Sequence, residues 1–144
     1  MKNIIIVTNI GFNIAKNLLK SKKTKISLKI REIKSKKIKL SLIDSKNIYL
    51  RLKYINLGDI KIFGFNGEVF SSYRKFLLKI LNKHNSSSIF TVGYLDDPVG
   101  YIPDSCSLRI GGYETDRSIS YFGLSSRFED SIEKKINLGL KNII

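Results

Sequence analysis

Hydrophobic residues recur along this chain at two different spacings, and each spacing predicts a different type of secondary structure. Over 9–21, 68–83 and 126–141 they recur every three or four residues, which is typical of amphipathic helices. In the last segment Ile132 and Ile136 fall on one face. The sequence therefore predicts about three helices, each with one face for a shared core.

Between the first two helical segments, apolar residues alternate with polar ones. Alternation of this kind indicates strands with one buried and one solvated face. It runs over 24–30, 38–42 and 48–54, with polar turns near Ser35 and at 44–46. These segments predict three half-exposed antiparallel strands, whose lysines form the solvated face of a sheet.

Two later segments, 60–65 and 88–94, are apolar almost without interruption. Runs of this length predict strands that are buried on both faces. Residues 96–103 predict a loop with a short extended piece. The fold class that follows is α+β, with a mixed or antiparallel sheet covered by about three helices.

Length and composition set further limits. A chain of 144 residues, 42% of them hydrophobic, is expected to form a single domain over 1–144 with a real core. No stretch approaches the roughly 18 apolar residues of a membrane span, so we expect neither a transmembrane helix nor a signal peptide. Cys106 is the only cysteine, which excludes an intrachain disulfide and a cysteine-based zinc cluster.

The net charge of +14 is concentrated in the first 60 residues, which hold 15 Lys/Arg against three acids. Such a surface attracts anionic partners, nucleic acids and membranes among them. However, lysines outnumber arginines 20 to six and positions 20–47 contain no aromatic residue, whereas nucleic-acid sites favour arginine and stacked aromatics. We interpret the charge as a solvated basic face and expect no nucleic-acid binding.

Small and chemically able residues gather between Gly58 and Glu114, where seven of the ten glycines and both prolines lie. Loops of this composition commonly carry function. Three motifs follow one another there: GEVF at 67–70, GYLDDPVGYIPD at 93–104 and GGYE at 111–114. In this order they resemble the C-terminal half of the catalytic domain of the neutral/alkaline (non-lysosomal) ceramidases, a family of zinc amidohydrolases.

The resemblance is strong over 57–114, weak elsewhere, and implies a role for three residues. Glu68 would be a zinc ligand, Tyr101 would be the family's tyrosine zinc ligand, and the Tyr113 hydroxyl would face the reacting amide carbonyl. A carboxylate oxygen suits Zn²⁺, and a hydroxyl donor stabilises charge that develops on a carbonyl oxygen. Without the resemblance, Glu68 reads as a first-turn helix carboxylate and Tyr101 as a packed ring. Glu114 reads as a local structural carboxylate.

Part of such a site is missing here. The family takes two zinc-binding histidines and a serine nucleophile from a region that precedes these motifs. This chain has only His84, which we interpret as a helix-end or solvent-facing residue. The resemblance therefore implies a half-domain whose zinc site would be completed by an N-terminal half on a separate chain. We expect an exposed apolar patch where that half packs.

Two departures from the family pattern fall near Glu68. Asn66 stands where the family often has proline, and this difference would loosen the turn. Asp96 and Asp97 stand where the family tends to have asparagine, and they would either tighten cation binding or face solvent.

Three hypotheses follow. The chain is the C-terminal portion of a ceramidase-like zinc amidohydrolase, which acts on lipid amides of the ceramide type and is inactive alone. Alternatively, it is a non-catalytic remnant or binding module of the same fold, or a small basic nucleic-acid-binding protein. The motifs favour the first hypothesis, and the missing histidines favour inactivity of the isolated chain.

Overall fold

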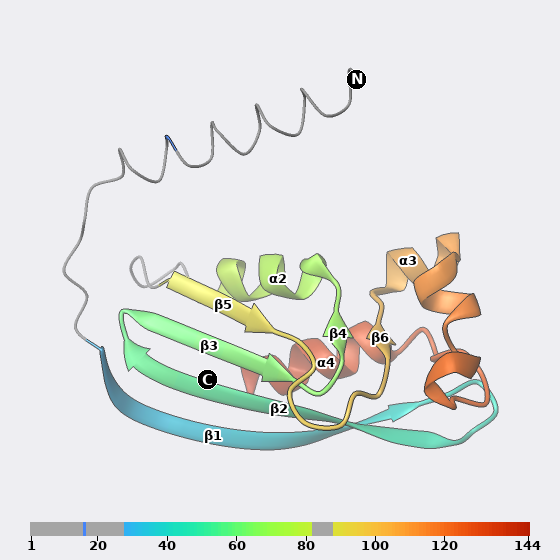
Figure 1. Cartoon of the computed structure of the whole chain (residues 1–144), viewed down its shortest axis with the longest axis horizontal. Helices are drawn as coiled ribbons and strands as arrows, with labels where there is room; N and C mark the ends of the chain where they lie inside the picture. Colours follow the sequence, from blue (N-terminus) through green and yellow to red (C-terminus); the bar gives the residue numbers. More distant parts are fainter. Residues whose placement is uncertain (1–15, 17–27, 82–87) are drawn as a thin grey trace.

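The computed structural model describes residues 28–81 and 88–144, together with Lys16, and its centre is a four-stranded mixed sheet (Figure 1). The strand order is β1-β2-β3-β5, in which the first two pairings are antiparallel and the β3–β5 pairing is parallel. The strands are β1 (Leu28–Ser41), β2 (Asn47–Gly58), β3 (Ile60–Phe65) and β5 (Ser88–Val92). The predicted α+β class with a mixed sheet is confirmed.

Two helices cover one face of this sheet. They are α2 (Ser71–Leu81), which contacts β5, and α4 (Ile132–Lys141), which contacts β1, and the two helices also contact each other. The inward face expected within 126–141 is confirmed, because Ile132, Ile136 and Leu140 are buried.

The core lies between the helices and the alternate residues of the central strands. Across β2 and β3, Leu52 lies opposite Phe65 and Tyr54 lies opposite Phe63, and all four side chains are buried. The rings of Tyr54 and Phe63 are 5.0 Å apart between centroids. Each such side chain contributes about 1.5–3 kcal/mol through the apolar area that it removes from water, so these pairs fix the register of the sheet.

Shorter elements follow the sheet strands, and the sequence pattern did not predict most of them. They are β4 (Glu68–Val69), β6 (Tyr101–Ile102), α3 (Ser105–Ile110), a π-helical turn (Tyr113–Arg117) and a 3₁₀ turn (Ser120–Phe122). The helix expected over 68–83 begins only at Ser71, because Glu68 and Val69 pair with β6 instead. The expected helix over 9–21, the strand residues before Leu28 and His84 lie outside the described residues, except for Lys16.

The turn expected near Ser35 is wrong, since β1 runs through this position as one strand of 14 residues. From Glu32 to Leu40 the even-numbered residues are less exposed than their odd-numbered neighbours, and Ile38 and Leu40 are buried, whereas Leu28 and Ile30 are exposed. On the same side, the Lys34 ammonium reaches the backbone carbonyl of Ile144 at 3.2 Å. The polar stretch therefore belongs to a strand that extends past the core, where its side chains meet the C-terminal residues.

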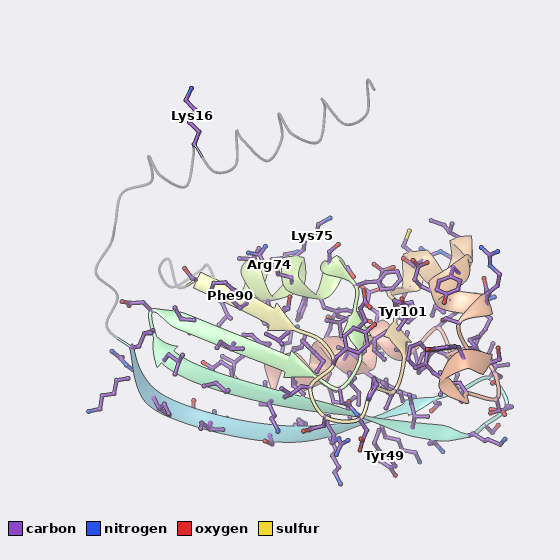
Figure 2. All side chains as sticks on the ribbon, viewed as in Figure 1. Lys16, Tyr49, Arg74, Lys75, Phe90 and Tyr101 are labelled. Carbon is purple, nitrogen blue, oxygen red and sulfur yellow. The ribbon has the colours of Figure 1, made fainter. Side chains whose placement is uncertain are left out.

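Of the two strands expected to be buried on both faces, β5 is buried on only one, whereas β3 is buried on both over Phe63, Gly64 and Phe65. In β5 Ile89 is buried whereas Phe90 and Val92 are exposed, and the first three residues of β3 are half-buried. Figure 2 shows Arg74 and Lys75 of α2 projecting above the sheet and Tyr49 projecting below it. Within the described residues the face opposite the helices is thus open around Ile33 and Phe90, whereas Leu95 of the loop after β5 packs on it at Gly64. No helix among these residues is long and apolar enough to cross a membrane.

We expect Gly139→Ala to destabilise the protein, because a Cβ at this position would lie 2.3 Å from Ile38 Cδ1 at the contact between α4 and β1. Overpacking costs about 1–3 kcal/mol, which exceeds the gain in helix propensity of up to about 1 kcal/mol. Chemical denaturation measures the difference. In the Gly139→Ala/Ile38→Val double variant the offending Cδ1 is absent, so the two effects should be less than additive. Simple additivity would show that the contact does not limit the packing of α4.

Candidate functional site

The three sequence motifs meet at the carboxyl ends of the parallel strands β3 and β5. Open sheets commonly place ligand sites at such ends, because the chain leaves both strands on the same edge. After β3 the chain forms β4, and the segment after β5 leads to β6, which pairs with β4 in parallel. The amide of Glu68 donates to the Gly100 carbonyl at 2.9 Å, and the amide of Val99 donates to the Asn66 carbonyl at 2.8 Å. In this register Glu68 lies opposite Tyr101.

Two glycines permit this close approach. A Cβ on Gly67 would lie 2.8 Å from Ile102 Cγ1 and 2.9 Å from the Gly100 carbonyl oxygen. A Cβ on Gly93 would lie 3.0 Å from the carbonyl oxygen of Gly67 itself. The backbone segments that follow β3 and β5 therefore pack against each other in a space that no larger residue fits without displacement.

Asn66 ties the turn before Glu68 to its surroundings. Its side chain is buried, its Oδ1 accepts from the Arg51 amide at 2.6 Å, and its Nδ2 donates to the Asp97 carbonyl at 3.3 Å. The expectation that asparagine loosens this turn is wrong, because these bonds link β2, the turn and the following loop. A proline could form neither bond through its side chain.

The structure brings Glu68, Tyr101 and Tyr113 together. Glu68 and Tyr101 are paired in β4 and β6, and the Tyr101 and Tyr113 rings meet edge to face with centroids 6.1 Å apart. Phe122 also packs edge to face with the Tyr101 ring, at 5.8 Å between centroids. Tyr101 (Figure 2) is half-buried whereas Tyr113 is 48% exposed, so the cluster opens to solvent on the Tyr113 side.

Tyr94 is a further member of this cluster that sequence reasoning missed. Its hydroxyl donates to the Glu68 carboxylate. This bond, with some desolvation and the nearby Tyr101 hydroxyl, raises the pKa of Tyr94, since a neutral phenol is the donor that a carboxylate needs. Tyr94 has φ of 55°, a left-handed conformation that is uncommon for a bulky residue. The only sequence signal for it is its place beside Gly93 in a motif already singled out.

Asp116 holds the loop that carries Tyr113. One of its oxygens accepts from the Gly112 amide at 2.7 Å and the other lies 3.0 Å from the Arg127 guanidinium. The bond from Gly112, aided by Thr115 and Arg127, lowers the pKa of Asp116 below its ordinary value of 3.8. Glu114 is exposed, whereas the neighbouring Asp116 is the structural carboxylate of this turn.

The two aspartates that distinguish this chain from the ceramidase pattern face β2. Asp96 Oδ2 lies 3.5 Å from Lys53 Nζ and 4.0 Å from Arg51 Nε, and Asp97 lies 3.5 Å from Arg51 Nη2. These ion pairs are partly exposed, and their contribution to stability is small. Their effect is to neutralise two cations of the sheet and to position the loop between β5 and β6.

The donor set supplies only part of a zinc site. Glu68 and Tyr101 offer oxygen ligands on one face, with the Tyr94 hydroxyl beside them. A catalytic zinc takes three protein ligands, drawn mostly from histidine, cysteine and carboxylates. Among residues 28–81 and 88–144, no group of three or more His, Cys, Asp or Glu side chains could hold a metal ion. Among the described residues, Glu68 and Tyr101 would therefore need further ligands to hold a zinc ion, and zinc binding stays a prediction.

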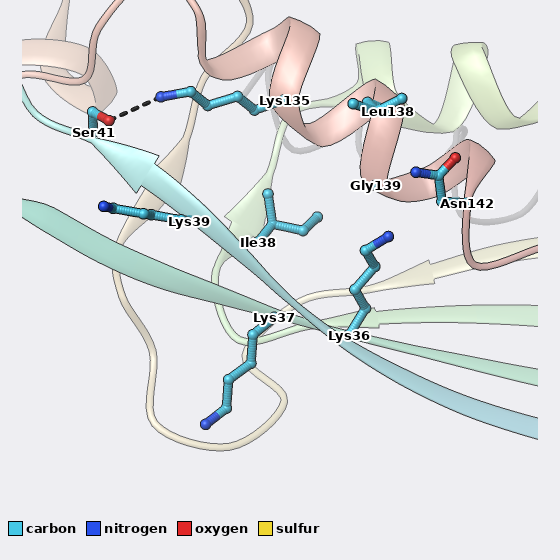
Figure 3. Close-up of a pocket in the computed structure, with 9 residues that line it drawn as sticks. All are labelled: Lys36, Lys37, Ile38, Lys39, Ser41, Lys135, Leu138, Gly139 and Asn142. Atoms are coloured by element: carbon cyan, nitrogen blue, oxygen red, sulfur yellow. Dashed lines mark hydrogen bonds between the residues drawn. The ribbon is translucent and has the colours of Figure 1, made fainter.

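A cavity of about 470 Å³ lies elsewhere, between β1 and α4 (Figure 3). Lys36 and Lys135 border it, but the Lys135 ammonium already donates to Ser41 at 2.8 Å and lies 3.6 Å from Glu129. Lys37 points away from α4 in Figure 3. The cavity contains none of the clustered residues, and its lysines do not converge on one point.

Comparisons with protein-family models, with curated proteins and with solved structures found no match to this chain. The ceramidase-like assignment and the roles of Glu68, Tyr101 and Tyr113 therefore stay predictions.

We expect Gly67→Ala to lower the free energy of unfolding by about 1–3 kcal/mol, because the new methyl group meets a backbone carbonyl that cannot move without breaking the β4–β6 pairing. Gly64→Ala is the matched control. Its Cβ would also meet an atom at 2.8 Å, but that atom is Cδ2 at the end of the Leu95 side chain, which can rotate. Urea denaturation of both variants measures the difference, and equal losses would contradict the role given to Gly67.

We expect Asp116→Asn to lower the melting temperature at pH 7 and to have a smaller effect at pH 3. The folded-state pKa of Asp116 is depressed, so its stabilisation is fully present above pH 3.8 and is lost as the pH falls through the folded pKa. Thermal unfolding followed by circular dichroism at both pH values measures this. Glu114→Gln, which changes an exposed carboxylate of the same turn, should show no such dependence. A gap between wild type and Asp116→Asn that is no smaller at the lower pH would contradict the assignment.

Proposed function

We propose that this chain is the C-terminal portion of a ceramidase-like zinc amidohydrolase, which acts on N-acyl amides of the ceramide type and is inactive alone. The observation that carries the proposal is the alignment of Glu68 with Tyr101, next to Tyr113, at the carboxyl ends of two parallel strands. The motif resemblance selects these three residues from the sequence. Their proximity supports a common site.

Each residue has a chemical role in this proposal. Glu68 and Tyr101 would hold the zinc through their oxygen atoms, and Tyr94 holds the Glu68 carboxylate by a hydrogen bond. When bound, the metal polarises the amide carbonyl and lowers the pKa of a bound water. Tyr113 is exposed at the edge of the cluster, and its hydroxyl donates toward the carbonyl oxygen as negative charge develops there.

The site is incomplete among the described residues, and the proposal includes a partner for that reason. A second polypeptide supplies the remaining zinc ligands and the nucleophile. The non-catalytic alternative keeps the same cluster and differs only in that no partner completes it. The nucleic-acid alternative has less support, because Asp96 and Asp97 neutralise two of the cations on the sheet.

We expect the purified chain to retain no stoichiometric zinc after dialysis against a weak chelator and to release no fatty acid from labelled ceramide. In a zinc titration followed by tyrosine difference absorbance, we expect weak binding. Glu68→Gln and Tyr101→Phe should each weaken it by about tenfold or more, or about 1.4 kcal/mol, since the first replaces a carboxylate ligand by a neutral amide and the second removes the phenol oxygen.

Tyr121→Phe is the control for this titration, because Tyr121 is 82% exposed and lies outside the cluster. Zinc binding that is the same in Glu68→Gln as in wild type would contradict the ligand assignment. Stoichiometric zinc or turnover by the isolated chain would contradict the requirement for a partner.

A further inference from the structure

The open face of the sheet carries an apolar row that spans all four strands. The pairing registers align its members directly, from β1 across β2 and β3 to β5. The four side chains are Ile33, Ile55, Ile62 and Phe90. Ile33 is 59% exposed and Phe90 is 52% exposed, while the two central isoleucines are half-buried between them. A sheet face that only meets water carries polar residues at such positions.

The same face is cationic toward its other end. Lys37 lies opposite Arg51, and Lys39 lies opposite Tyr49, which is exposed. Arg51 is paired with the aspartates of the loop after β5. Neither Lys37 nor Lys39 has an ion-pair partner within the described part of the chain. The open face therefore combines an apolar row with a border of uncompensated positive charge.

The apolar row is continuous with the candidate site. Along β5 the exposed side chains of Phe90 and Val92 lead to Tyr94, which is also exposed and whose hydroxyl reaches Glu68. A polypeptide that packs on the open face would consequently lie next to Glu68 and Tyr101, the two proposed zinc ligands.

We propose that the open face docks a second, acidic polypeptide, which presents an apolar strip bordered by Asp and Glu side chains. This inference deepens the proposed function, on which it rests for the partner's part in completing the site, but the evidence for the surface is separate. The opposite charge of the partner complements Lys37 and Lys39. A second copy of this chain is disfavoured, because two chains of net charge +14 would bring their lysine borders together.

The shape of the row favours a packed protein layer over a lipid surface. Ile55 and Ile62 lie within the sheet and are half-buried, so they do not protrude as an inserting loop tip does. A helix or a second sheet that packs on a sheet buries apolar side chains that are level with its surface in this way.

The test uses the full 144-residue chain and two fluorescently labelled synthetic helical peptides. Both peptides carry the same Leu and Ile residues on one face, and their remaining positions are Glu in one peptide and Lys in the other. Fluorescence anisotropy should show the Glu peptide binding at least about tenfold more tightly than the Lys peptide. Ile33→Ser/Phe90→Ser should weaken binding of the Glu peptide at least about tenfold, and Lys37→Glu/Lys39→Glu should reverse the preference. Ile110→Ser, at a 79% exposed position on α3, is the matched control and should bind as wild type does. All these positions are exposed, and circular dichroism verifies that the variants remain folded.

Several results would overturn the inference. They are equal binding of the two peptides, absence of binding, or insensitivity to the Ile33→Ser/Phe90→Ser change. Displacement of the Glu peptide by phosphatidylserine vesicles or by a single-stranded oligonucleotide would assign the face to another partner. If the chain forms a dimer that the Ile33→Ser/Phe90→Ser change dissociates, the open face binds a second copy of the chain. If peptide binding appears only after removal of residues 1–27, the open face is covered by that segment of the same chain. Peptide binding is measured without zinc or ceramide, and the Ile33→Ser/Phe90→Ser variant should leave the zinc titration unchanged. Failure of the docking proposal can therefore be distinguished from failure of the proposed zinc amidohydrolase function.

Discussion

The candidate site depends on how closely the backbone can approach itself at the carboxyl ends of β3 and β5. Gly67 and Gly93 have no Cβ, and this allows the segments that leave the two strands to pack together and β4 to pair with β6. In a parallel pair, aligned residues project to the same face, so this pairing sets Glu68 beside Tyr101. Asn66 then fixes the turn to β2 and the loop. The chemistry that we propose follows from backbone packing that glycine alone permits.

The molecule is built unequally on the two faces of its sheet. α2 and α4 bury one face and supply the core, whereas the opposite face carries an exposed apolar row within the described residues. β5 connects this asymmetry with the site. Its inward residue Ile89 anchors it to the core, Phe90 and Val92 face outward, and the chain then turns into the segment that holds Tyr94. The cluster that we propose as an incomplete zinc site and the exposed apolar row thus lie at the two ends of one segment, and a single partner could pack against both.

In the folded chain part of the positive charge of the sheet is neutralised by ion pairs, and part is not. Lys37 and Lys39 of β1 and Lys53 of β2 alternate with core residues, as expected for the solvated side of a sheet, whereas Lys34 and Lys36 lie on the same side of β1 as Ile38. Asp96 and Asp97 of the loop after β5 neutralise Arg51 and Lys53, and Lys37 and Lys39 lie at one end of the open face without an ion-pair partner among the described residues. The distribution of the charge, more than its total, indicates what kind of partner suits this face.

By itself the sequence determined the α+β class, the inner face of β2, the inward face of α4 and the position of Glu68 between a strand and a helix. These features depend on local periodicity, which records which side of an element faces the core. The motif order also selected Glu68, Tyr101 and Tyr113. Only the tertiary structure decided that β1 is one strand, that β5 is exposed on its outer side and that Tyr94 binds Glu68. Periodicity cannot show whether a second layer covers an apolar face, and a bond across 26 positions depends on the paths of both backbone segments through space, which no local pattern records.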